Sequence, residues 1–583
     1  MYKLLVRSVN NVRALINRLG YFIILPVIFI SIQVFFILFD WLTKIIKPDQ
    51  SKLLTVINDA RTWLASHSLL IAIPGNLLKL LIVVVIFLFF PSVRSLIVFI
   101  FKKVWSFFKM LPGKQTKEMF RRYMNIGRFS FYQDQSGIFG RLKRQYPSGT
   151  GFVILPMDME FMKAGPVKES YYQQMDQLAE LKDNHPDIFF PFVFIDPRRI
   201  EHKTKGTYTD PKTNKATPFL IYKITAGKTE LQECFVKTFI EGNKFSGFKI
   251  YPALGYYPFD ERLLPLWKYA ADNQIPILTH CIRGTIFYRG QKKHSWDYHP
   301  VYKQAMFRKN VIDPATGKVM TKTKQVKDPV TGELVTKIEK VTESDYQPLV
   351  LAERDNVDFS YNFTNPMNYL CLLEEEFLRQ VIENAGETKD DLKILFGYTD
   401  KDTPLKYDLR HLKLCFGHFG GDDEWKRYFE QDRYDQSNQL TQHLKTGIDF
   451  TETAAGKPSP GKPEQLWKYT DWYSIICSMM LQYDHVYSDI SYILHDDADI
   501  FPLLKETLRN PGLRTKVLYG TDFYVVRNHK SDKNMLADMY GGLSEEEFDM
   551  IARANPRRFL NLSVPTNGVD KETITVDKGL VKE

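Results

Sequence analysis

The hydrophobic pattern of the chain begins with two long apolar segments. Residues 21–39 are almost entirely apolar, which is long enough to cross a hydrocarbon core of roughly 30 Å. Residues 69–101 are also apolar but contain Lys79 and Arg94, so this region is either a second span or a re-entrant or interfacial element. The pattern predicts a membrane anchor with two transmembrane segments in residues 1–109.

The charges beside these segments predict the topology of the anchor. Lysine and arginine residues precede the first segment and follow the second, so the positive-inside rule places both flanks in the cytoplasm. The first segment is too long for a usual signal peptide, and no small-residue cleavage pattern follows it. We therefore predict an integral membrane protein that contacts the lipid bilayer and holds its large domain on the cytoplasmic side.

After the anchor, short apolar runs alternate with amphipathic helical periods. The runs predict eight strands, at residues 151–157, 189–195, 247–251, 275–279, 357–363, 412–416, 486–490 and 516–519. Helices are predicted at residues 171–182, 230–240, 261–272, 367–383, 465–481, 500–508 and 545–554. Strands that alternate with helices favour a parallel sheet, and eight such units predict a (β/α)8 TIM barrel of the α/β class.

The barrel prediction divides the chain into parts. The barrel itself is expected over residues 150–563, joined to the anchor by a basic linker at residues 110–149 and followed by a polar tail at 564–583. Three Asp-Pro-x-Thr turns, beginning at Asp210, Asp313 and Asp328, predict β-hairpins. Two of them lie in an insertion at residues 288–354, which could form a lid or a surface for a protein partner or a second copy.

Composition limits the classes of function. The 583 residues include 78 Lys+Arg and 68 Asp+Glu, and much of the net charge of +10 lies beside the apolar segments, so we expect no nucleic-acid partner. The five cysteines are widely spaced and odd in number, which fits a reducing compartment. No phosphate-binding loop, dinucleotide motif or serine-hydrolase elbow is present.

Polar residues at the carboxyl ends of the predicted strands are the candidate site. In a barrel, side chains from these ends converge on one site. The candidates are Asp158, Glu160, Lys249, His280, His418 and Asp522. Two imidazoles and three carboxylates are typical of a divalent metal site. Taken singly, each has a simpler explanation, because such an aspartate can cap a helix, such a histidine can be structural and such a lysine can form an ion pair.

The motifs that carry these residues resemble a known family. In order they are GFKIYP, PILTHC, LCFGHFGG, VYSDIS, VLYGTDFY and NPRRFLNL, and they span about residues 151–562. The series is similar to the amidohydrolase superfamily, in its amidohydrolase-related branch with aminocarboxymuconate semialdehyde decarboxylase-like enzymes. The resemblance implies a metal-dependent TIM-barrel enzyme, usually a hydrolase and sometimes a non-oxidative decarboxylase.

The resemblance also implies roles for three residues. His280 would bind the metal, and His418 would be a second ligand or would polarise the substrate or water. Asp522 would bind the metal and act as general base on metal-bound water, whose pKa the ion lowers. The remaining strand-end lysine, Lys249, would bridge metals or line the pocket.

The first strand departs from the family pattern. Such enzymes typically carry an HxH pair where this chain has Asp158 and Glu160. Carboxylates favour harder ions, so Mn, Fe(II) or Mg join Zn as candidates, with Zn the first expectation. A barrel that has lost its metal and become a binding module is the alternative that this change leaves open.

A loop after the fourth predicted strand offers further candidates. Arg283, His294 and His299 could bind a substrate, and an arginine there could hold a carboxylate. For each residue taken singly, packing of this aromatic loop against the insertion is the favoured explanation. Residues 196–199, which follow the second predicted strand, are expected to begin a helix with solvated arginines.

Three functions follow from these observations. The first is a membrane-anchored, metal-dependent hydrolase in which an activated water attacks a C–N or C–O bond of a small-molecule substrate. The second is a decarboxylase that uses the same site. The third is a catalytically inactive, membrane-tethered scaffold whose hairpins bind a partner.

Overall fold

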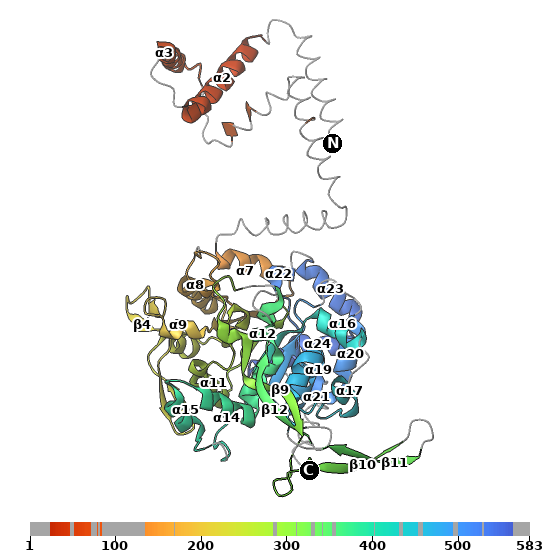
Figure 1. Cartoon of the computed structure of the whole chain (residues 1–583). Helices are drawn as coiled ribbons and strands as arrows, with labels where there is room; N and C mark the ends of the chain where they lie inside the picture. Colours follow the sequence, from red (N-terminus) through yellow and green to blue (C-terminus); the bar gives the residue numbers. More distant parts are fainter. Residues whose placement is uncertain are drawn as a thin grey trace. The chain divides into compact units, whose positions relative to one another are not determined.

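The computed structural model divides the chain into two units, Met1–Phe120 and Arg121–Glu583, which are considered separately (Figure 1). It describes residues 24–46, 52–70, 78–79, 82–83, 99 and 134–563, the last range with gaps at 168, 284–287, 311, 328–332, 341, 353–356, 401–402, 431–434, 453–458, 494–499 and 527–529. Most of the predicted linker and the predicted tail lie outside these residues, so those boundaries stay predictions.

The first unit contains two described helices, α2 (Ile24–Ile46) and α3 (Lys52–Ser66). Within the described residues, no helix is both long enough and apolar enough to cross a membrane. The apolar run accounts for only part of α2, because the helix continues through Asp40, which Arg61 of α3 binds at 2.7 Å. The predicted transmembrane region and the predicted integral membrane localisation are therefore wrong. Most of the second apolar region, 69–101, lies outside the described residues.

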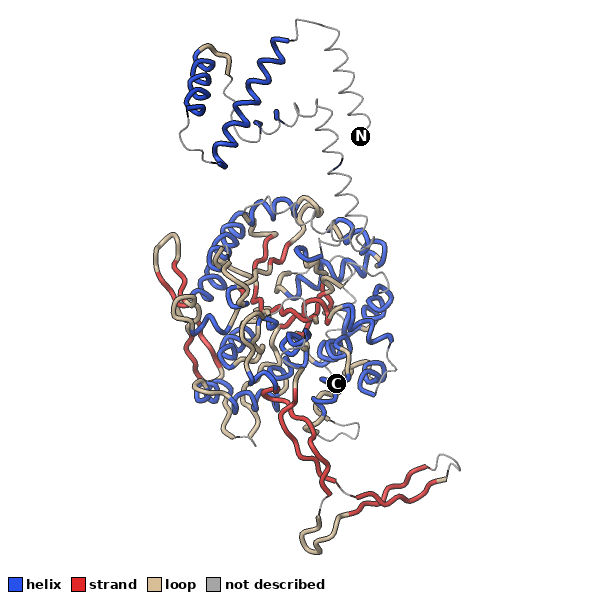
Figure 2. The backbone as a smooth tube through the Cα atoms, turned by 45° about the horizontal axis from the view of Figure 1, so that its top comes forward, coloured by secondary structure: helices blue, strands red, loops and turns tan. Residues whose placement is uncertain are grey.

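The second unit is built on a parallel sheet of seven strands in the order β1-β2-β7-β8-β13-β14-β15. Its strands are β1 (Phe152–Ile154), β2 (Phe189–Phe194), β7 (Gly247–Ile250), β8 (Ile277–Ile282), β13 (Leu414–Gly420), β14 (Val486–Asp489) and β15 (Val517–Leu518). These correspond to seven of the eight predicted strands. Figure 2 shows the strands in the interior of the unit with helices around them.

The predicted closed barrel of eight strands is wrong in one segment. Residues 357–363 alternate apolar and polar positions, yet they form η7 (Val357–Ser360) and α12 (Tyr361–Thr364). The Asn368 side chain donates hydrogen bonds to the carbonyls of Asn362 and Phe363, at 2.9 and 3.0 Å, and so satisfies groups that a strand would pair. In the described residues the sheet is therefore open, with β1 and β15 at its edges.

The predicted helices are mostly present around the sheet. They appear as α8 (Tyr171–Asn184), η5 (Glu261–Leu263) with α11 (Leu264–Asp272), α13 (Leu370–Leu373) with α14 (Glu375–Asn384), α18 (Lys462–Tyr469) with α19 (Trp472–Gln482), α20 (Ile500–Arg509), and α24 (Glu545–Asp549) with η9 (Met550–Ala554). The helix predicted at 230–240 is wrong in its first part. That part is strand β6 (Lys228–Leu231), which pairs with β5 (Tyr222–Thr225) and so gains a cross-strand partner that the sequence did not reveal.

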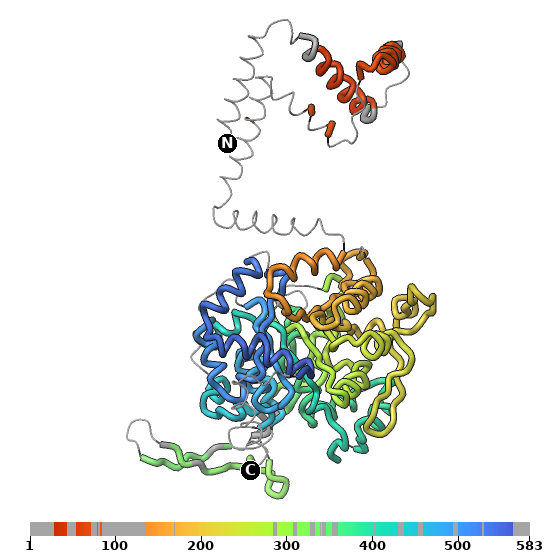
Figure 3. Tube along the Cα trace, turned by 180° about the vertical axis from the view of Figure 1, so that it is seen from behind, coloured from red at the N-terminus to blue at the C-terminus, as the bar shows by residue number. Residues whose placement is uncertain are grey.

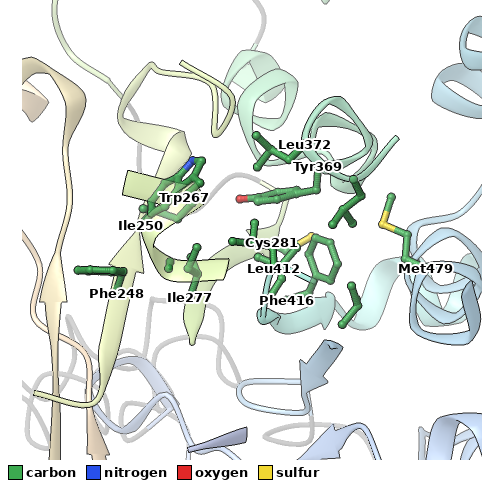
Figure 4. Packing of buried hydrophobic residues seen from close by; sticks show 14 of the residues in the cluster. Phe248, Ile250, Trp267, Ile277, Cys281, Tyr369, Leu372, Leu412, Phe416 and Met479 are labelled. Carbon is green, nitrogen blue, oxygen red and sulfur yellow. The ribbon is translucent and has the colours of Figure 1, made fainter. Parts of the chain in front are cut away.

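The outward side of the sheet packs on these helices. Figure 4 shows Phe248 and Phe416 from the strands in one cluster with Trp267, Tyr369 and Met479 from the surrounding helices. The ring centres of Phe248 and Trp267 are 6.4 Å apart, and those of Phe416 and Tyr369 are 5.0 Å apart. All five side chains are fully buried. This cluster holds the strands in place without using the side chains that face the opposite side of the sheet.

The first and last parts of the barrel unit meet at its surface. Helix α7 (Gln135–Lys143) and helix α23 (Asp532–Gly542) lie near each other in both Figure 1 and Figure 3. The Tyr146 hydroxyl donates to the Asp532 carboxylate at 3.0 Å and joins the two segments. The ends of the described unit are thus tied to the same side of the fold.

The predicted hairpins are present where they are described. Strands β3 (Thr207–Thr209) and β4 (Ala216–Pro218) pair around the turn that begins at Asp210, and Ile312 pairs with Val319 around the turn at Asp313. The turn at Asp328 lies outside the described residues. In the insertion, β9 (Tyr298–Asn310) pairs with β12 (Thr342–Val350), and β10 (Thr321–Lys327) pairs with β11 (Leu334–Lys340).

The β10–β11 hairpin contributes little buried surface. In the described residues its two strands pair only with each other, and Leu334 and Ile338 are 66% and 69% exposed. A two-stranded hairpin is marginal in water by itself. The hairpin therefore contributes little to the stability of the sheet that carries the candidate site.

Replacing residues 312–340 by a short Gly-Ser linker should change the unfolding free energy of the barrel by no more than about 0.5 kcal/mol, as for other exposed segments. Truncating the fully buried Trp267 to alanine is the positive control and should cost about 3–5 kcal/mol. Urea unfolding followed by tryptophan fluorescence measures both. A hairpin deletion that costs as much as the control would contradict this description.

Candidate functional site

The strand register places four positions at one level on the inner side of the sheet. Lys249, Leu278, Cys415 and Tyr487 are successive partners across β7, β8, β13 and β14. Because side chains alternate along a strand, the residues two positions further on face the same side, nearer the carboxyl ends. These residues are Tyr251, His280, Gly417 and Asp489. The site is therefore a direct result of the register.

An irregularity in β13 directs His418 into this layer. The pairing of β13 with β8 shifts between Gly417 and Gly420, and His418 has a positive φ of 69°. This conformation is uncommon for a side chain with a Cβ and costs of order 1–3 kcal/mol, so it needs compensation. Part of that compensation is visible, because the His418 backbone N–H donates to the Asp489 carboxylate at 3.1 Å.

Two imidazoles form the centre of the site. His418 Nε2 lies 3.0 Å from His280 Nδ1, and the second ring nitrogen of each also has a partner. His280 Nε2 lies 3.1 Å from the Tyr251 hydroxyl, and His418 Nδ1 lies 2.9 Å from the Ser491 hydroxyl. Burial, followed by the neighbouring His418 and Lys249, lowers the pKa of His280 well below its ordinary value. His280 is therefore neutral at physiological pH.

Asp489 orients this pair and was not among the predicted site residues. It accepts hydrogen bonds from the Ser491 hydroxyl and, at 3.0 Å, from the Ser491 backbone N–H. Ser491 in turn contacts His418, so the carboxylate acts on the imidazole through a hydroxyl. The signal was in the sequence, because the motif VYSDIS places Asp489 at the end of its strand and Ser491 two residues later.

Lys249 brings a positive charge beneath the imidazoles. Its side chain is buried, and burial lowers its pKa to about 8, while Asp489 and Asp522 oppose that change. Asp522, which follows β15, is half-buried and has a positive φ of 51°. The structure thus brings together Lys249, His280 and His418, and Asp522 lies close enough to Lys249 to raise its pKa.

The carboxylates after the first strand are held by protein cations. Asp158 is 1% exposed, and its Oδ2 accepts from Arg199 Nε at 2.7 Å and Nη2 at 2.6 Å. Burial raises the pKa of Asp158, and Arg199 opposes the rise. Glu160 forms an ion pair with Lys205. The prediction of solvated arginines at residues 196–199 is wrong for Arg199, because the buried Asp158 requires a partner.

The remaining candidates lie apart from one another. Arg283 is half-exposed and forms an ion pair with the buried Glu424 at 2.9 Å. His294 is on the surface, 3.7 Å from Asp297. His299 is buried: its Nε2 lies 3.0 Å from Asn368 Oδ1, and its Nδ1 accepts from two backbone N–H groups. A role for these three in binding a substrate stays a prediction.

The predicted metal ion can be compared with the donors that are present. In the part of the chain that the structure describes, no three His, Cys, Asp or Glu residues are grouped so that they could hold an ion. Asp158 and Glu160 are bound to cations, and both nitrogens of His280 and His418 have partners. A ligating imidazole must offer a free lone pair. In this arrangement the residues do not fit a divalent ion.

No family model and no curated protein matches the chain. Solved structures do. A 2,6-dihydroxybenzoate decarboxylase complexed with 2,6-dihydroxybenzoate is 13% identical with a TM-score of 0.32, covering 77% of this chain and 93% of its own. A 5-carboxyvanillate decarboxylase from Sphingomonas paucimobilis is 10% identical with a TM-score of 0.29 and coverage of 67% and 71%. A 4-oxalomesaconate hydratase from Rhodopseudomonas palustris is 11% identical with a TM-score of 0.25 and coverage of 71% and 75%.

The first two of these structures are decarboxylases and the third is a hydratase. The resemblance to the amidohydrolase superfamily rests on the motifs of the sequence. At such identities and TM-scores, the similarity says nothing about the substrate of this chain. The assignment of individual site residues depends on the geometry of this chain.

Buried His299 predicts a pH dependence of stability. Burial lowers its pKa to about 3, whereas an unfolded histidine titrates near 6.5. Stability is therefore complete above about pH 6.5 and falls as the pH falls, because only the unfolded chain takes up the proton. Between about pH 6 and pH 5, the unfolding free energy of the unchanged protein should therefore fall by about 1 kcal/mol per pH unit because of His299. The His299→Gln variant should lack this part of the pH dependence.

Urea unfolding at several pH values measures the slope, and His294→Gln serves as the matched control because His294 is exposed. The control should keep the slope of the unchanged protein. Equal slopes for the His299 variant and the unchanged protein would show that His299 titrates normally in the folded state.

Proposed function

We propose that this chain is an enzyme of amidohydrolase type that decarboxylates a small carboxylic acid by proton transfer from its imidazole pair. The observation that carries the proposal is the contact between His418 Nε2 and His280 Nδ1, with Asp489 behind it through Ser491. Proton transfer by a positioned histidine typically contributes a factor of about 10²–10⁴ to a rate.

The environment of each residue suggests its part in the reaction. His280 is kept neutral, so it serves as the hydrogen-bond partner that orients His418. Asp489 holds His418 in position, because it accepts the His418 backbone N–H and the hydroxyl of Ser491, which contacts His418 Nδ1. His418 is then the residue that gives a proton to the substrate.

Lys249 gives the proposal its substrate class. A buried ammonium group near the imidazoles attracts an anion and stabilises negative charge that develops in a transition state. In the reaction, the bond between the carboxylate carbon and its neighbour breaks, and the electron pair stays on the neighbouring carbon. That carbon takes the proton from His418, and carbon dioxide leaves.

Hydrolysis of a C–N or C–O bond is the second candidate. Asp522 supports it, because a half-buried carboxylate beside the site can take a proton from an attacking water. The two reactions are separated by their products, since only decarboxylation releases carbon dioxide.

The first test is the His418→Gln variant, assayed with a panel of aromatic and unsaturated carboxylic acids for release of carbon dioxide. Turnover should fall by about 10²–10⁴ relative to the unchanged protein, because glutamine cannot supply the proton. The exposed His443→Gln is the matched control and should keep full turnover. Undiminished turnover in the His418 variant, or products of hydrolysis without carbon dioxide, would refute the decarboxylase.

The second test concerns Asp489, which acts through other residues. Asp489→Asn keeps the size of the side chain and removes its charge, so kcat should fall about tenfold or more while KM changes little. The matched control is the exposed Asp484→Asn. A fall in turnover together with a fall in melting temperature would indicate that Asp489 has only a structural role. A fall in kcat at an unchanged melting temperature supports its role in positioning His418.

A further inference from the structure

We propose that this chain holds no divalent ion at the carboxyl ends of its strands, and that Arg199, Lys205 and Lys249 supply fixed positive charge beside the carboxylates that were predicted to bind one. The proposal is independent of the reaction, because it concerns which cations occupy the site. It rests on the partners of each predicted ligand.

Both oxygens of Asp158 already accept hydrogen bonds from the protein. Its Oδ2 accepts two hydrogen bonds from Arg199, and its Oδ1 accepts the Glu160 backbone N–H at 3.1 Å. The guanidinium is itself held in place, since it lies 4.8 Å from the centre of the Tyr172 ring and 5.2 Å from that of Tyr171. A metal ion would have to displace a buried and oriented arginine.

The other two carboxylates also have cations. Glu160 is paired with Lys205, whose ammonium group comes from the segment after α9 (Pro197–Glu201). The negative charges of Asp522 and Asp489 raise the pKa of the buried Lys249, so its ammonium group lies within the electrostatic range of Asp522. Asp158 and Glu160 thus have ion-paired cations, and Asp522 has a lysine within the range of its charge.

The imidazoles complete the argument. A hydrogen bond between His280 and His418 requires that one ring donates and the other accepts, so this pair of nitrogens is used within the protein. The outer nitrogens contact Tyr251 and Ser491. A divalent ion would break these contacts and would also meet repulsion from the buried Lys249 ammonium group.

The presence of protein cations in the place of a metal ion has a chemical reason. An HxH pair is neutral and leaves the charge of a bound metal available, whereas Asp158 and Glu160 bring two negative charges that need compensation. Arg199 and Lys205 provide it through their ion pairs with the two carboxylates. Carboxylates in place of the two imidazoles therefore fit with protein cations in place of the metal ion.

The experiment measures metal content in the full chain, purified without chelator and dialysed, by inductively coupled plasma mass spectrometry. Calorimetric titration with zinc chloride or manganese chloride and melting temperatures with and without EDTA accompany it. We expect far less than one ion per chain, no saturable uptake and the same melting temperature in EDTA. His280→Gln and His418→Gln are measured in parallel, to separate the site from ions on the surface.

One ion per chain that both variants lose would overturn the proposal, as would a clear drop in melting temperature in EDTA that His280→Gln abolishes. An ion that the variants keep is bound elsewhere and supports it. If His280→Gln does not fold, the measurement on His418→Gln decides. Carbon dioxide release in the presence of EDTA is scored separately, so the decarboxylase and the metal-free site can fail independently.

Discussion

The parallel register of β7, β8, β13 and β14 is the constraint on which the site depends. It places Lys249 one level below Tyr251, His280 and Asp489, so that residues more than two hundred positions apart in the chain face the same interior. Gly417 occupies the remaining position of the layer, and a Cβ there would lie 2.7 Å from the Thr279 carbonyl. A shift of any strand by one residue would turn its polar residue to the outer side, where Trp267 and Tyr369 pack.

Burial then requires that every charge in this interior has a partner. The surroundings of Asp158, Lys249 and Asp489 penalise an isolated charge. Arg199 compensates the charge of Asp158, the charges of Asp489 and Asp522 act on Lys249, and the His418 N–H donates to Asp489. The strained backbone of His418 is partly compensated in the same way, because in that conformation its N–H donates to Asp489. Pairing of buried charge therefore determines which chemistry the site can perform.

Two predictions from local sequence patterns are wrong because a residue outside the pattern changes the structure. The alternating residues 357–363 are typical of a strand, but the side chain of Asn368 binds their carbonyls and they form helical turns. The apolar run 21–39 is typical of a membrane span, but α2, which begins within this run at Ile24, continues through Asp40 and its ion pair with Arg61. In each case the deciding group lies outside the window in which the pattern was recognised.

The sequence alone determined the order of the strands and most helices, and it identified His280, His418, Lys249 and Asp522 as strand-end residues. Periodicity and position within an element are local properties, so they can be recognised without coordinates. Only the tertiary structure decided that Arg199 neutralises Asp158, that His418 contacts His280, and that Asp489 orients the pair. These are contacts between residues far apart in the chain, and they depend on strand register and on the backbone conformation at Gly417 to Gly420, which no local pattern specifies.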